Sequence, residues 1–480
     1  MNNGISAEDL AKLLRDEVKR FSPGERLPSS RALVERFRSS PVTVSRALAV
    51  LAAEGLVVTR PGAGTYRARG PAVPAVPVRP ADTSWQQIAL SAEGAGDAAP
   101  RTVDASGVLA TLTAPPPGVI ALNGGYLHPT LQPEQALGAA LARAARRPGA
   151  WDRPPMAGLT PLRAWFARET GGTVGTANVL ITAGGQAALT TALHALAAPG
   201  APVLLESPSY PGALAVARAA GLRPVPVPVD ADGVRPDLLA EAFAATGARV
   251  FFCQPLFQNP TGTVLGAERR RQVVGIARAA GAFVVEDDFA RRLAHGGPLP
   301  PPLVAEDQDG TVVHVTSLTK PTSPSLRVGA LIARGPVLER LRAIQVVDSF
   351  FVPRPLQEAA LELVGAPAWP RHLRAVAAGL RERSAALLAA LGRELPCAEP
   401  EYAPSGGYHL WLRLPFGTDE TALTAAALSQ GVAVAPGRPY FVAEAPAPHL
   451  RLSFADTANV DEVGEGVRRL AAAGASIGLG

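Results

Sequence analysis

The chain has 480 residues, of which 47% are hydrophobic and 18% charged, so it is long enough for two or three domains with buried cores. Its two cysteines, Cys253 and Cys397, argue against a disulfide-stabilised secreted fold and favour a reducing, cytoplasmic location. The amino-terminal sequence carries no recognisable export signal, and the most membrane-like window, residues 179–197, predicts a strand, a turn and a helix.

The net charge of +5 is unevenly placed along the chain. Residues 1–70 contain 12 Lys and Arg against 7 Asp and Glu, whereas the acidic and basic residues of the remainder balance. A small basic module joined to a large neutral one is the distribution expected of a nucleic-acid-binding head. A chance surface charge is the alternative.

Residues 1–69 predict helices followed by a β-hairpin. Ser29 or Ser30 can cap a first short helix, and Ser40 can cap a second, which has Pro41 in its first turn. Apolar residues recur on one face of each helix: Leu33, Val34 and Phe37 in the first, and Val44, Leu48 and Leu51 in the second. Two short helices at this spacing indicate a helix-turn-helix.

This module carries the candidate DNA contacts. The second helix would present Thr43, Ser45 and Arg46 to a major groove. In the hairpin, where Gly62 and Gly64 permit the turn, Arg60 and Arg67 are placed to contact phosphates.

The stretches "LPSSRAL" and "ALAVLAAEGLV" resemble the winged helix of the GntR family of bacterial transcription regulators, and the resemblance covers nearly the whole module. It implies binding to double-stranded operator DNA, with Arg31 and Arg46 as the firmest carried-over contacts. Pro41 stands where family members usually have arginine, so the base contacts are expected to differ from those of the family. A winged helix that does not bind DNA is the alternative.

Residues 70–117 are rich in proline, alanine and glycine and show no sustained period, which is the composition of a linker. As a flexible coil this segment would span roughly 40 Å root-mean-square. The sequence therefore predicts a head, a linker and a body.

Residues 118–480 alternate helical stretches with short apolar runs: "NVLIT", "PVLLE", "RVFFCQP", "AFVVED", "TVVHVT" and "VGALIA". Such runs indicate strands buried on both faces of a largely parallel sheet. The fold class expected for the body is α/β, with a smaller carboxy-terminal subdomain after about residue 336.

Ligands of open α/β sheets bind at the carboxyl ends of the strands, and there this sequence is unusually polar. The residues that follow the first five runs are Gly184, Gly185 and Gln186; Tyr210; Asn259; Glu286, Asp287 and Asp288; and Ser317, Lys320 and Arg327. The glycines open a helix and suit a phosphate, although an ordinary turn has the same sequence. Together the set offers phosphate donors, an aromatic face, a carboxylate for a cationic ring nitrogen and a Schiff-base amine. Pyridoxal phosphate requires these groups.

The motifs "AGLTPLR", "ESPSY", "QNPTG", "EDDF" and "TSLTK" before "LRVG" resemble, in this order, those of the fold-type-I aminotransferases. The resemblance runs from about residue 120 to the end and implies pyridoxal 5'-phosphate as cofactor. It assigns the Schiff base to Lys320, the pyridine-nitrogen contact to Asp287, the ring-hydroxyl contact to Asn259, ring stacking to Tyr210, the phosphate to Gly185, Gln186, Ser317 and Arg327, and an effector or substrate carboxylate to Arg451. Arginine grips a carboxylate with two parallel hydrogen bonds.

Lys320 is the one lysine beyond residue 19 in a chain that contains 43 arginines. A solvated surface cation is the alternative, but such a position would ordinarily be arginine in this sequence. Arginine stays protonated and cannot serve as the amine of a Schiff base. For Asp287 the alternative is an ion pair with an arginine, and for Arg451 it is an exposed strand residue.

Two positions depart from the aminotransferase pattern. Phe289 stands where the family usually has a tyrosine after the aspartate. Trp151 is the nearest aromatic to the position of a tyrosine that reaches the partner subunit's phosphate. Either change can leave cofactor binding intact while weakening transamination.

A GntR-type head, a linker and an aminotransferase-like body resemble the MocR family of bacterial regulators over the whole chain. The resemblance implies a head-to-tail homodimer that senses pyridoxal phosphate or an amino compound on it. Two alternatives remain: an active aminotransferase with a DNA-binding head, and a regulator whose body has lost the cofactor. The sequence selects neither the target genes nor the effector.

Overall fold

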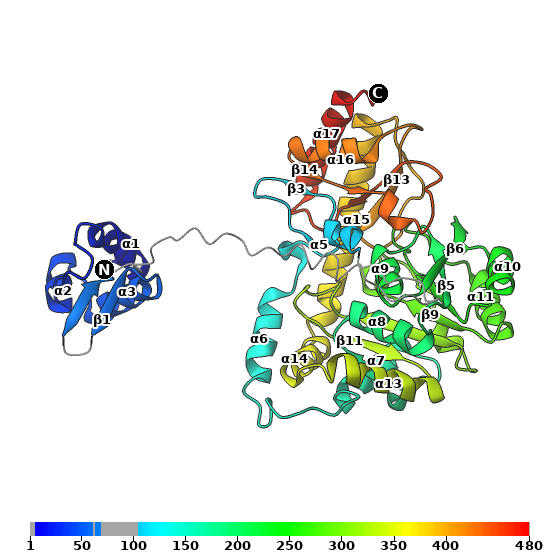
Figure 1. Ribbon diagram of the computed structural model, residues 1–480, viewed down its shortest axis with the longest axis horizontal. Helices are drawn as coiled ribbons and strands as arrows, with labels where there is room; N and C mark the ends of the chain where they lie inside the picture. Colours follow the sequence, from blue (N-terminus) through cyan, green and yellow to red (C-terminus); the bar gives the residue numbers. More distant parts are fainter. Residues whose placement is uncertain (1–4, 61–62, 69–103, 480) are drawn as a thin grey trace, which may run out of the picture. The chain divides into compact units, whose positions relative to one another are not determined.

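A computed structural model describes residues 5–60, 63–68 and 104–479. They belong to two units, Met1–Gly94 and Ala95–Gly480, called here the head and the body. The elements of the head are α1 (Ala7–Val18), α2 (Ser30–Phe37), α3 (Pro41–Ala53), β1 (Val57–Arg60) and β2 (Gly64–Arg67) (Figure 1). The predicted helices and hairpin are therefore present.

Side-chain caps fix where α2 and α3 begin. Ser29 accepts a hydrogen bond from the backbone N–H of Ala32 at 3.2 Å, so Ser29 rather than Ser30 caps α2. Ser40 accepts one from the N–H of Thr43 at 3.1 Å, and Pro41 occupies the first turn of α3.

The head has one apolar core, to which α1, α2, α3 and the hairpin all contribute. Leu33 of α2 and Leu51 of α3 are buried in it, as the periodicity predicted. β1 and β2 pair antiparallel, and Gly64 begins β2 at a φ of 113°, which glycine tolerates. Gly62, the other expected turn glycine, lies outside the described residues.

The body is built on an eight-stranded sheet in the order β4-β11-β10-β9-β8-β5-β6-β7. Its strands are β4 (Val179–Thr182), β5 (Pro202–Ser207), β6 (Arg223–Asp230), β7 (Gly233–Val234), β8 (Val250–Cys253), β9 (Phe283–Asp287), β10 (Val312–Ser317) and β11 (Gly329–Ile332). β6, β5, β8, β9 and β10 pair in parallel, whereas β11 and β7 are antiparallel to their neighbours. The mostly parallel α/β sheet predicted from the apolar runs is confirmed.

Helices cover both faces of this sheet. Successive residues of a strand point to opposite faces, and each face is apolar, so each must be covered. Phe251 and Phe252 are adjacent in β8 and fully buried, yet they belong to different apolar clusters. The Phe251 cluster includes α7 (Thr160–Thr170), α10 (Pro236–Thr246), α11 (Ala267–Ala279), α12 (Leu303–Glu306) and α14 (Arg354–Gly365). The Phe252 cluster includes α8 (Gly185–Leu196), α9 (Pro211–Ala219) and α13 (Pro336–Ser349).

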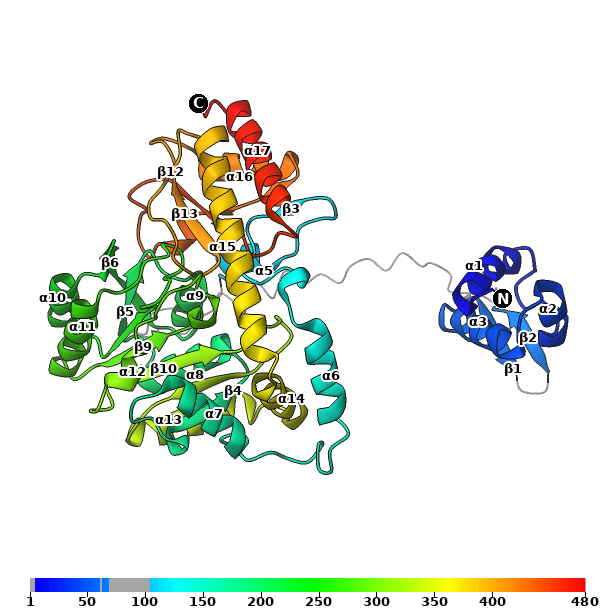
Figure 2. The same cartoon turned by 180° about the vertical axis from the view of Figure 1, so that it is seen from behind.

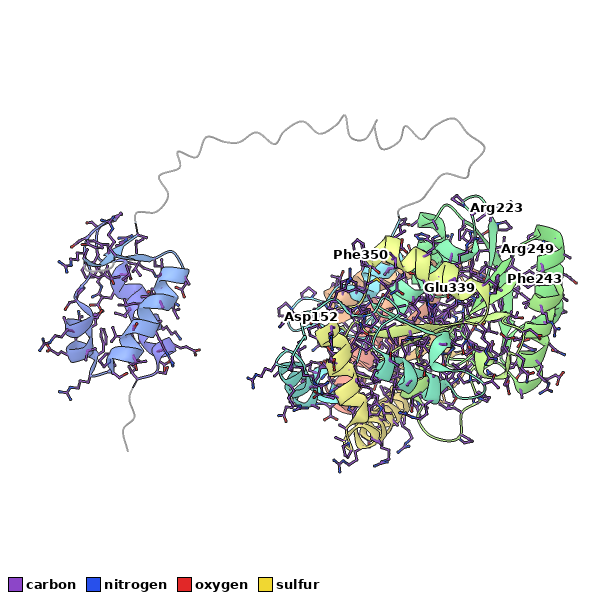
Figure 3. The ribbon with its side chains drawn as sticks, turned by 90° about the horizontal axis from the view of Figure 1, so that it is seen from below. Asp152, Arg223, Phe243, Arg249, Glu339 and Phe350 are labelled. Carbon is purple, nitrogen blue, oxygen red and sulfur yellow. The ribbon has the colours of Figure 1, made fainter. Side chains whose placement is uncertain are left out.

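Labelled side chains in Figure 3 mark the two ends of the body as seen in that view, which are not the two faces of the sheet. Phe243 of α10 and Arg249, next to β8, lie on one side, and Asp152 lies on the other. On the Asp152 side, α6 (Glu134–Ala144) packs against α14, where Arg143 pairs with Glu362 at 2.7 Å.

The strand β6 was not anticipated from the sequence, because it reads "RPVPVPVD" and proline usually argues against a strand. Its prolines alternate, so Pro224, Pro226 and Pro228 share one side of the backbone while the residues between them keep their N–H groups. β7 pairs only with Val229 and Asp230, so residues 223–228 have a strand, β5, on one side only, and missing donors are tolerated on the other side.

The smaller subdomain has a four-stranded sheet in the order β12-β13-β16-β15. Its elements are β12 (Glu399–Pro400), β13 (His409–Arg413), β15 (Ala435–Pro436), β16 (His449–Ser453), α15 (Trp369–Glu394), α16 (Glu420–Ser429) and α17 (Val460–Ser476). The start of the body joins it, because β3 (Ile120–Ala121) pairs with β14 (Val432–Ala433). α13 and α14 stay with the large sheet, so the subdomain begins later than residue 336, with the long helix α15 (Figure 2).

The last part of residues 70–117, which were expected to form a linker, contains a helix. Residues 70–103 lie outside the described residues, but α5 (Ser106–Leu112) is helical and contacts α9 of the body. This helix was not predicted from the sequence, because it is short and the residues around it are rich in proline. Within the described ranges, no helix is both long and apolar enough to cross a membrane.

Candidate functional site

A cavity of about 360 Å³ lies at the carboxyl ends of the parallel strands. All eight residues expected to bind the cofactor line it: Gly185, Gln186, Tyr210, Asn259, Asp287, Ser317, Lys320 and Arg327. They come from five segments of the chain, at or after the ends of β4, β5, β8, β9 and β10. They meet because parallel strands place their carboxyl ends at one edge of the sheet. β11 is antiparallel, so Arg327, which precedes it, reaches the same edge.

One end of the cavity is built to bind an anion. Gly184 caps α8 with a φ of 86°, and the backbone N–H groups at the start of this helix have no intrahelical partner. The Arg327 guanidinium lies beside them and donates to the carbonyl of Ala183 at 3.0 Å. The positive φ of residue 184 favours glycine, and a Cβ there would lie 2.9 Å from Cζ of Arg327, so the guanidinium would have to move. Helix N-terminus, arginine and the Ser317 hydroxyl together suit a phosphate.

Tyr210 forms an aromatic wall of the cavity, and Gln186 holds it. The Tyr210 hydroxyl donates to Oε1 of Gln186 at 3.0 Å, and Nε2 of Gln186 donates to the carbonyl of Gly212 at 3.2 Å. The side chain of Gln186 is therefore engaged in orienting the ring, which leaves its backbone N–H for an anion.

The three carboxylates that end β9 have different partners. Glu286 lies 2.8 Å from Nδ1 of His314, and Asp288 pairs with Arg291. Asp287 has no ion pair among the described residues and lines the cavity. Burial raises the pKa of Asp287 to about 6, against the lowering effect of a hydrogen bond from Gln254. A cationic ligand nitrogen would supply its missing counter-ion.

Gln254 was missed in the sequence, although it connects three groups of the site. Its Nε2 donates to Oδ2 of Asp287 at 2.7 Å, its Oε1 accepts from the backbone N–H of Asn259 at 3.0 Å, and its own N–H donates to Glu206 at 2.9 Å. Oδ1 of Asn259 is buried without a hydrogen-bond partner among the described residues. A bound group that hydrogen-bonds to Asn259 would resolve this deficit.

Lys320 points its amine into the same space. Nζ donates to the carbonyl of Gly125 at 2.6 Å and lies 4.3 Å from the ring centre of Tyr126 and 5.1 Å from that of Tyr408. Burial lowers the pKa of Lys320 to about 8, and the positive charges of Arg451 and Arg327 act in the same direction. A larger share of this amine is thus neutral, and so nucleophilic, than for an exposed lysine.

In the head, the expected DNA contacts divide into two groups. Arg31, Ser45, Arg46 and Arg60 are exposed. The Thr43 hydroxyl is half-buried and hydrogen-bonds to that of Ser40 at 2.8 Å, so it also closes the helix cap.

Arg67, which was expected to contact a DNA phosphate, has hydrogen-bond partners within the head. Its Nη1 donates to the carbonyl of Lys19 at 3.1 Å and also to that of Phe21. The guanidinium therefore ties β2 to the end of α1, a partnership across 46 and 48 residues that local sequence does not reveal. Arg31, Ser45, Arg46 and Arg60 are the exposed candidate contacts, and a contact of Arg67 with DNA stays a prediction.

Family models match both the head and the body, in agreement with the two resemblances found in the sequence. Residues 6–66 match the model for bacterial regulatory proteins of the gntR family, and residues 139–467 match that for aminotransferase class I and II. The chain belongs to the aminotransferase class I and II family. Its head is of the GntR type, and relatives named as HTH-type transcriptional regulators align with more than 90% of this chain.

The relatives cover either the body or the whole chain. A 2-aminoadipate transaminase of Thermus thermophilus is 34% identical over 359 residues, 74% of this chain and 89% of the relative. YdcR of Escherichia coli, named as an HTH-type transcriptional regulator, is 28% identical over 452 residues, 91% of this chain and 92% of the relative. The solved structure of LysN, an α-aminoadipate aminotransferase from T. thermophilus in complex with N-(5'-phosphopyridoxyl)-L-leucine, is 34% identical with a TM-score of 0.73, covering 78% of this chain and 96% of LysN.

Pyridoxal phosphate is the cofactor that this aminotransferase fold implies, and the cavity fits it. The anion end suits the phosphate, Tyr210 offers a face to the ring, and Asp287, which forms no ion pair in the described part of the chain, suits a protonated ring nitrogen. The unpartnered Oδ1 of Asn259 and the amine of Lys320 complete the set.

Arg451 does not line the cavity, in contrast to the cofactor residues. It is 1% exposed, and its Nη2 donates to the carbonyls of Asn123 and Gly124 at 2.6 and 2.8 Å. Its Nε has no partner among the described residues, and its guanidinium lies 6.0 Å from the ring centre of Tyr408, which does line the cavity. Arg451 is thus a buried cation directly behind the cavity wall, not an exposed strand residue.

The two positions that depart from the aminotransferase pattern differ in location. Phe289 lines the cavity, and its ring meets the edge of Tyr408 with ring centres 6.0 Å apart. The rings of Tyr126 and Tyr408 lie near Nζ of Lys320. The sequence did not point to them, because they come from segments outside the recognised motifs. Trp151 is 80% exposed and away from the cavity lining.

Proposed function

We propose that this protein is a transcription regulator of the MocR type. In this proposal the head binds double-stranded operator DNA, and the body binds pyridoxal phosphate covalently through Lys320 and responds to the cofactor or to an amino compound. Such a protein acts where the chromosome is, in the cytoplasm. The supporting observation is that one cavity gathers Lys320 with all the other expected cofactor residues, in a chain that also carries a GntR-type head.

Each residue has a definite part in this proposal. When bound, the cofactor supplies an aldehyde that reacts with amines and a ring that withdraws electrons. Lys320 provides the amine, Asp287 holds the proton of the ring nitrogen, and Gln254 orients Asp287 and Asn259. Arg451 provides a guanidinium for a carboxylate in a setting with little competing water.

A regulator must convert binding into a change at the head. A ligand shifts a conformational equilibrium only by its differential affinity for two states. We infer that occupancy of the cavity selects the state of the body in which the heads of a head-to-tail homodimer engage an operator. The exposed apolar side chains of Val347 and Phe350, 81% and 67% exposed, favour a second copy. Sedimentation equilibrium tests the dimer.

An active aminotransferase with a DNA-binding head is the second candidate function. It is favoured by the buried amine of Lys320 with a pKa of about 8 and by the 34% identity to a 2-aminoadipate transaminase. Phe289 argues against it, since the usual tyrosine hydroxyl is missing there. Turnover of an amino donor with a keto acid separates the two functions.

The cofactor part of the proposal is tested by borohydride reduction of the full-length protein with pyridoxal phosphate, followed by peptide mass spectrometry. The modification is expected on Lys320, and Lys320→Ala is expected to lose both the label and the long-wavelength absorbance. Retention of the absorbance by Lys320→Ala would contradict the covalent link.

The regulatory part is tested with a DNA fragment selected by the full-length protein from a random pool. Binding is followed by fluorescence anisotropy while pyridoxal phosphate and amino compounds are titrated. A change in DNA affinity or bending supports the sensor. Unchanged binding with a fully loaded body would refute it.

A further inference from the structure

The helix α3 of the head is nearly free of charged side chains. It has 13 residues, of which Arg46 alone is charged, whereas the 8 residues of α2 include Arg31, Glu35 and Arg36. Proteins hold DNA phosphates mainly with Lys and Arg, and they read sequence through hydrogen bonds and apolar contacts to base edges. The composition of α3 therefore suits contacts to bases better than contacts to phosphates.

Burial divides α3 into two sides (Figure 1). The buried side faces the apolar core of the head and consists of Val44, Ala47, Leu48 and Leu51. The exposed side consists of Val42, Ser45, Arg46 and Ala49. These four residues follow the i, i+3, i+4 and i+7 spacing, so they form one continuous strip along the helix. The strip begins in the first turn of α3.

The first turn of α3 projects an apolar side chain outward. Val42 is 61% exposed, and Pro41 beside it is also exposed. The hydroxyls of Ser40 and Thr43 hydrogen-bond to each other at 2.8 Å, and the Ser40 hydroxyl also accepts the N–H of Thr43 at 3.1 Å. Both hydroxyls are thus engaged in closing the helix cap, which leaves Val42 as the outward group.

An apolar side chain at this position has one well-matched partner in a major groove. In a helix-turn-helix the N-terminal residues of the second helix contact the base edges. These edges carry hydrogen-bond donors and acceptors, except for the C5-methyl group of thymine. Valine packed on a donor or acceptor would remove it from water without a hydrogen bond, which is costly. Packed on the methyl group, both apolar surfaces leave water, which is favourable.

We propose that Val42 is a specificity-determining residue that packs on the C5-methyl group of a thymine in the operator. Arg46, on the same exposed strip, contacts a guanine, the base that arginine binds with two parallel hydrogen bonds. The two residues are four positions apart, about 6 Å along the helix axis, which is roughly two base-pair steps. The thymine and the guanine therefore lie within about three base pairs of each other. This inference rests on the proposed function, because it requires the head to bind operator DNA.

The experiment uses the full-length protein and the DNA fragment that it selects from a random pool. Each thymine of the fragment is replaced in turn by deoxyuridine, which lacks only the C5-methyl group and forms the same base pair. Fluorescence anisotropy gives the dissociation constant for each duplex. At the thymine that meets Val42, loss of the methyl contact is expected to weaken binding by roughly fourfold.

The variant Val42→Ala separates a direct contact from an effect of uracil on the shape of the duplex. A change in DNA shape or stiffness penalises the native protein and the variant alike, whereas the contact is lost only where the valine is present. In Val42→Ala the same replacement is expected to weaken binding by less than about twofold. Alanine has a higher helix propensity than valine, so α3 is expected to stay folded.

Val50 supplies a matched control on the same helix. It is 38% exposed and lies near the carboxyl end of α3, away from the turn that is expected to meet the bases. Val50→Ala changes the same residue type in the same way as Val42→Ala. It is expected to keep the roughly fourfold uracil penalty of the native protein.

The outcomes separate this inference from the proposed function. Equal uracil penalties in the native protein and in Val42→Ala at every thymine would overturn the inference, while specific binding of the selected fragment leaves the proposed function standing. Selection of fragments with no thymine in their shared positions would have the same meaning. Failure of the protein to select any fragment would overturn both.

Discussion

Gln254 donates a hydrogen bond from Nε2 to Oδ2 of Asp287 over 2.7 Å, and both side chains are buried. Oε1 of the same side chain accepts the N–H of Asn259 at 3.0 Å. One glutamine thus fixes the two residues expected to contact the nitrogen and the hydroxyl of the cofactor ring.

The substitution Gln254→Met keeps the length of the side chain and removes both hydrogen bonds. Loss of a hydrogen bond to a charged group costs on the order of 2 kcal/mol, so the dissociation constant of pyridoxal phosphate is expected to rise roughly tenfold or more. Absorbance titration of the apo-protein measures it. Gln430→Met, at an exposed position after α16, is the control, and equal affinities of the two variants would contradict the role of Gln254.

The rate of cofactor capture is expected to depend on pH through Lys320. The pKa of this amine is lowered to about 8, chiefly by burial, and only the neutral amine attacks an aldehyde. The rate constant for covalent binding should therefore rise as pH passes about 8, well below the pKa of an exposed lysine, about 10.4. Stopped-flow absorbance between pH 6.5 and 10 gives the midpoint. A midpoint near that of a free lysine would rule out the buried, activated amine.

Glu206 is expected to make the cofactor-free body less stable as pH rises. Burial raises its pKa to about 7, even though it accepts the N–H of Gln254. The folded protein keeps this proton up to about pH 7, whereas the unfolded chain releases it near pH 4.5. The stabilisation from the bound proton is thus fully present below about pH 4.5 and is lost as pH rises through about 7.

Glu206→Gln removes this titration, so the variant should lose less stability than the native protein between pH 4.5 and 7.5, by on the order of 3 kcal/mol. Thermal unfolding of the body across this range is the measurement. Glu241→Gln, exposed on α10, should follow the native profile. Parallel profiles for Glu206→Gln and the native protein would disprove the assignment.

The substitutions Arg46→Ala and Arg67→Ala are expected to affect different properties, DNA affinity in the first case and the stability of the head in the second. Arg46 is exposed on α3, so Arg46→Ala should weaken DNA binding by about 1–3 kcal/mol without altering thermal stability. Arg67 binds the carbonyls of Lys19 and Phe21, so Arg67→Ala should destabilise the head by about 1–3 kcal/mol. Anisotropy and calorimetry on the full-length protein separate the effects. A stable head in Arg67→Ala with weakened DNA binding would restore the phosphate contact expected from the sequence.

The combination of a GntR-type head with an aminotransferase-like body could be predicted from the sequence alone, and so could the convergence of the residues expected to bind the cofactor at one edge of the sheet. Apolar runs of strand length fix a parallel sheet, and such a sheet brings residues as distant as Gly185 and Lys320 to one edge whatever their separation in the chain. Helix caps such as Ser40 are equally readable, because their partner lies three residues away.

Which side chains support these residues depends on contacts that form only in the folded protein. Gln254 meets Asp287 across 33 positions, Asn123 meets Arg451 across 328, and Arg67 meets the end of α1 across nearly 50. Such hydrogen bonds depend on packing between segments and leave no local pattern in the sequence. For the same reason, the place of α5 in the cavity wall could not be predicted from a stretch that otherwise has the composition of a linker.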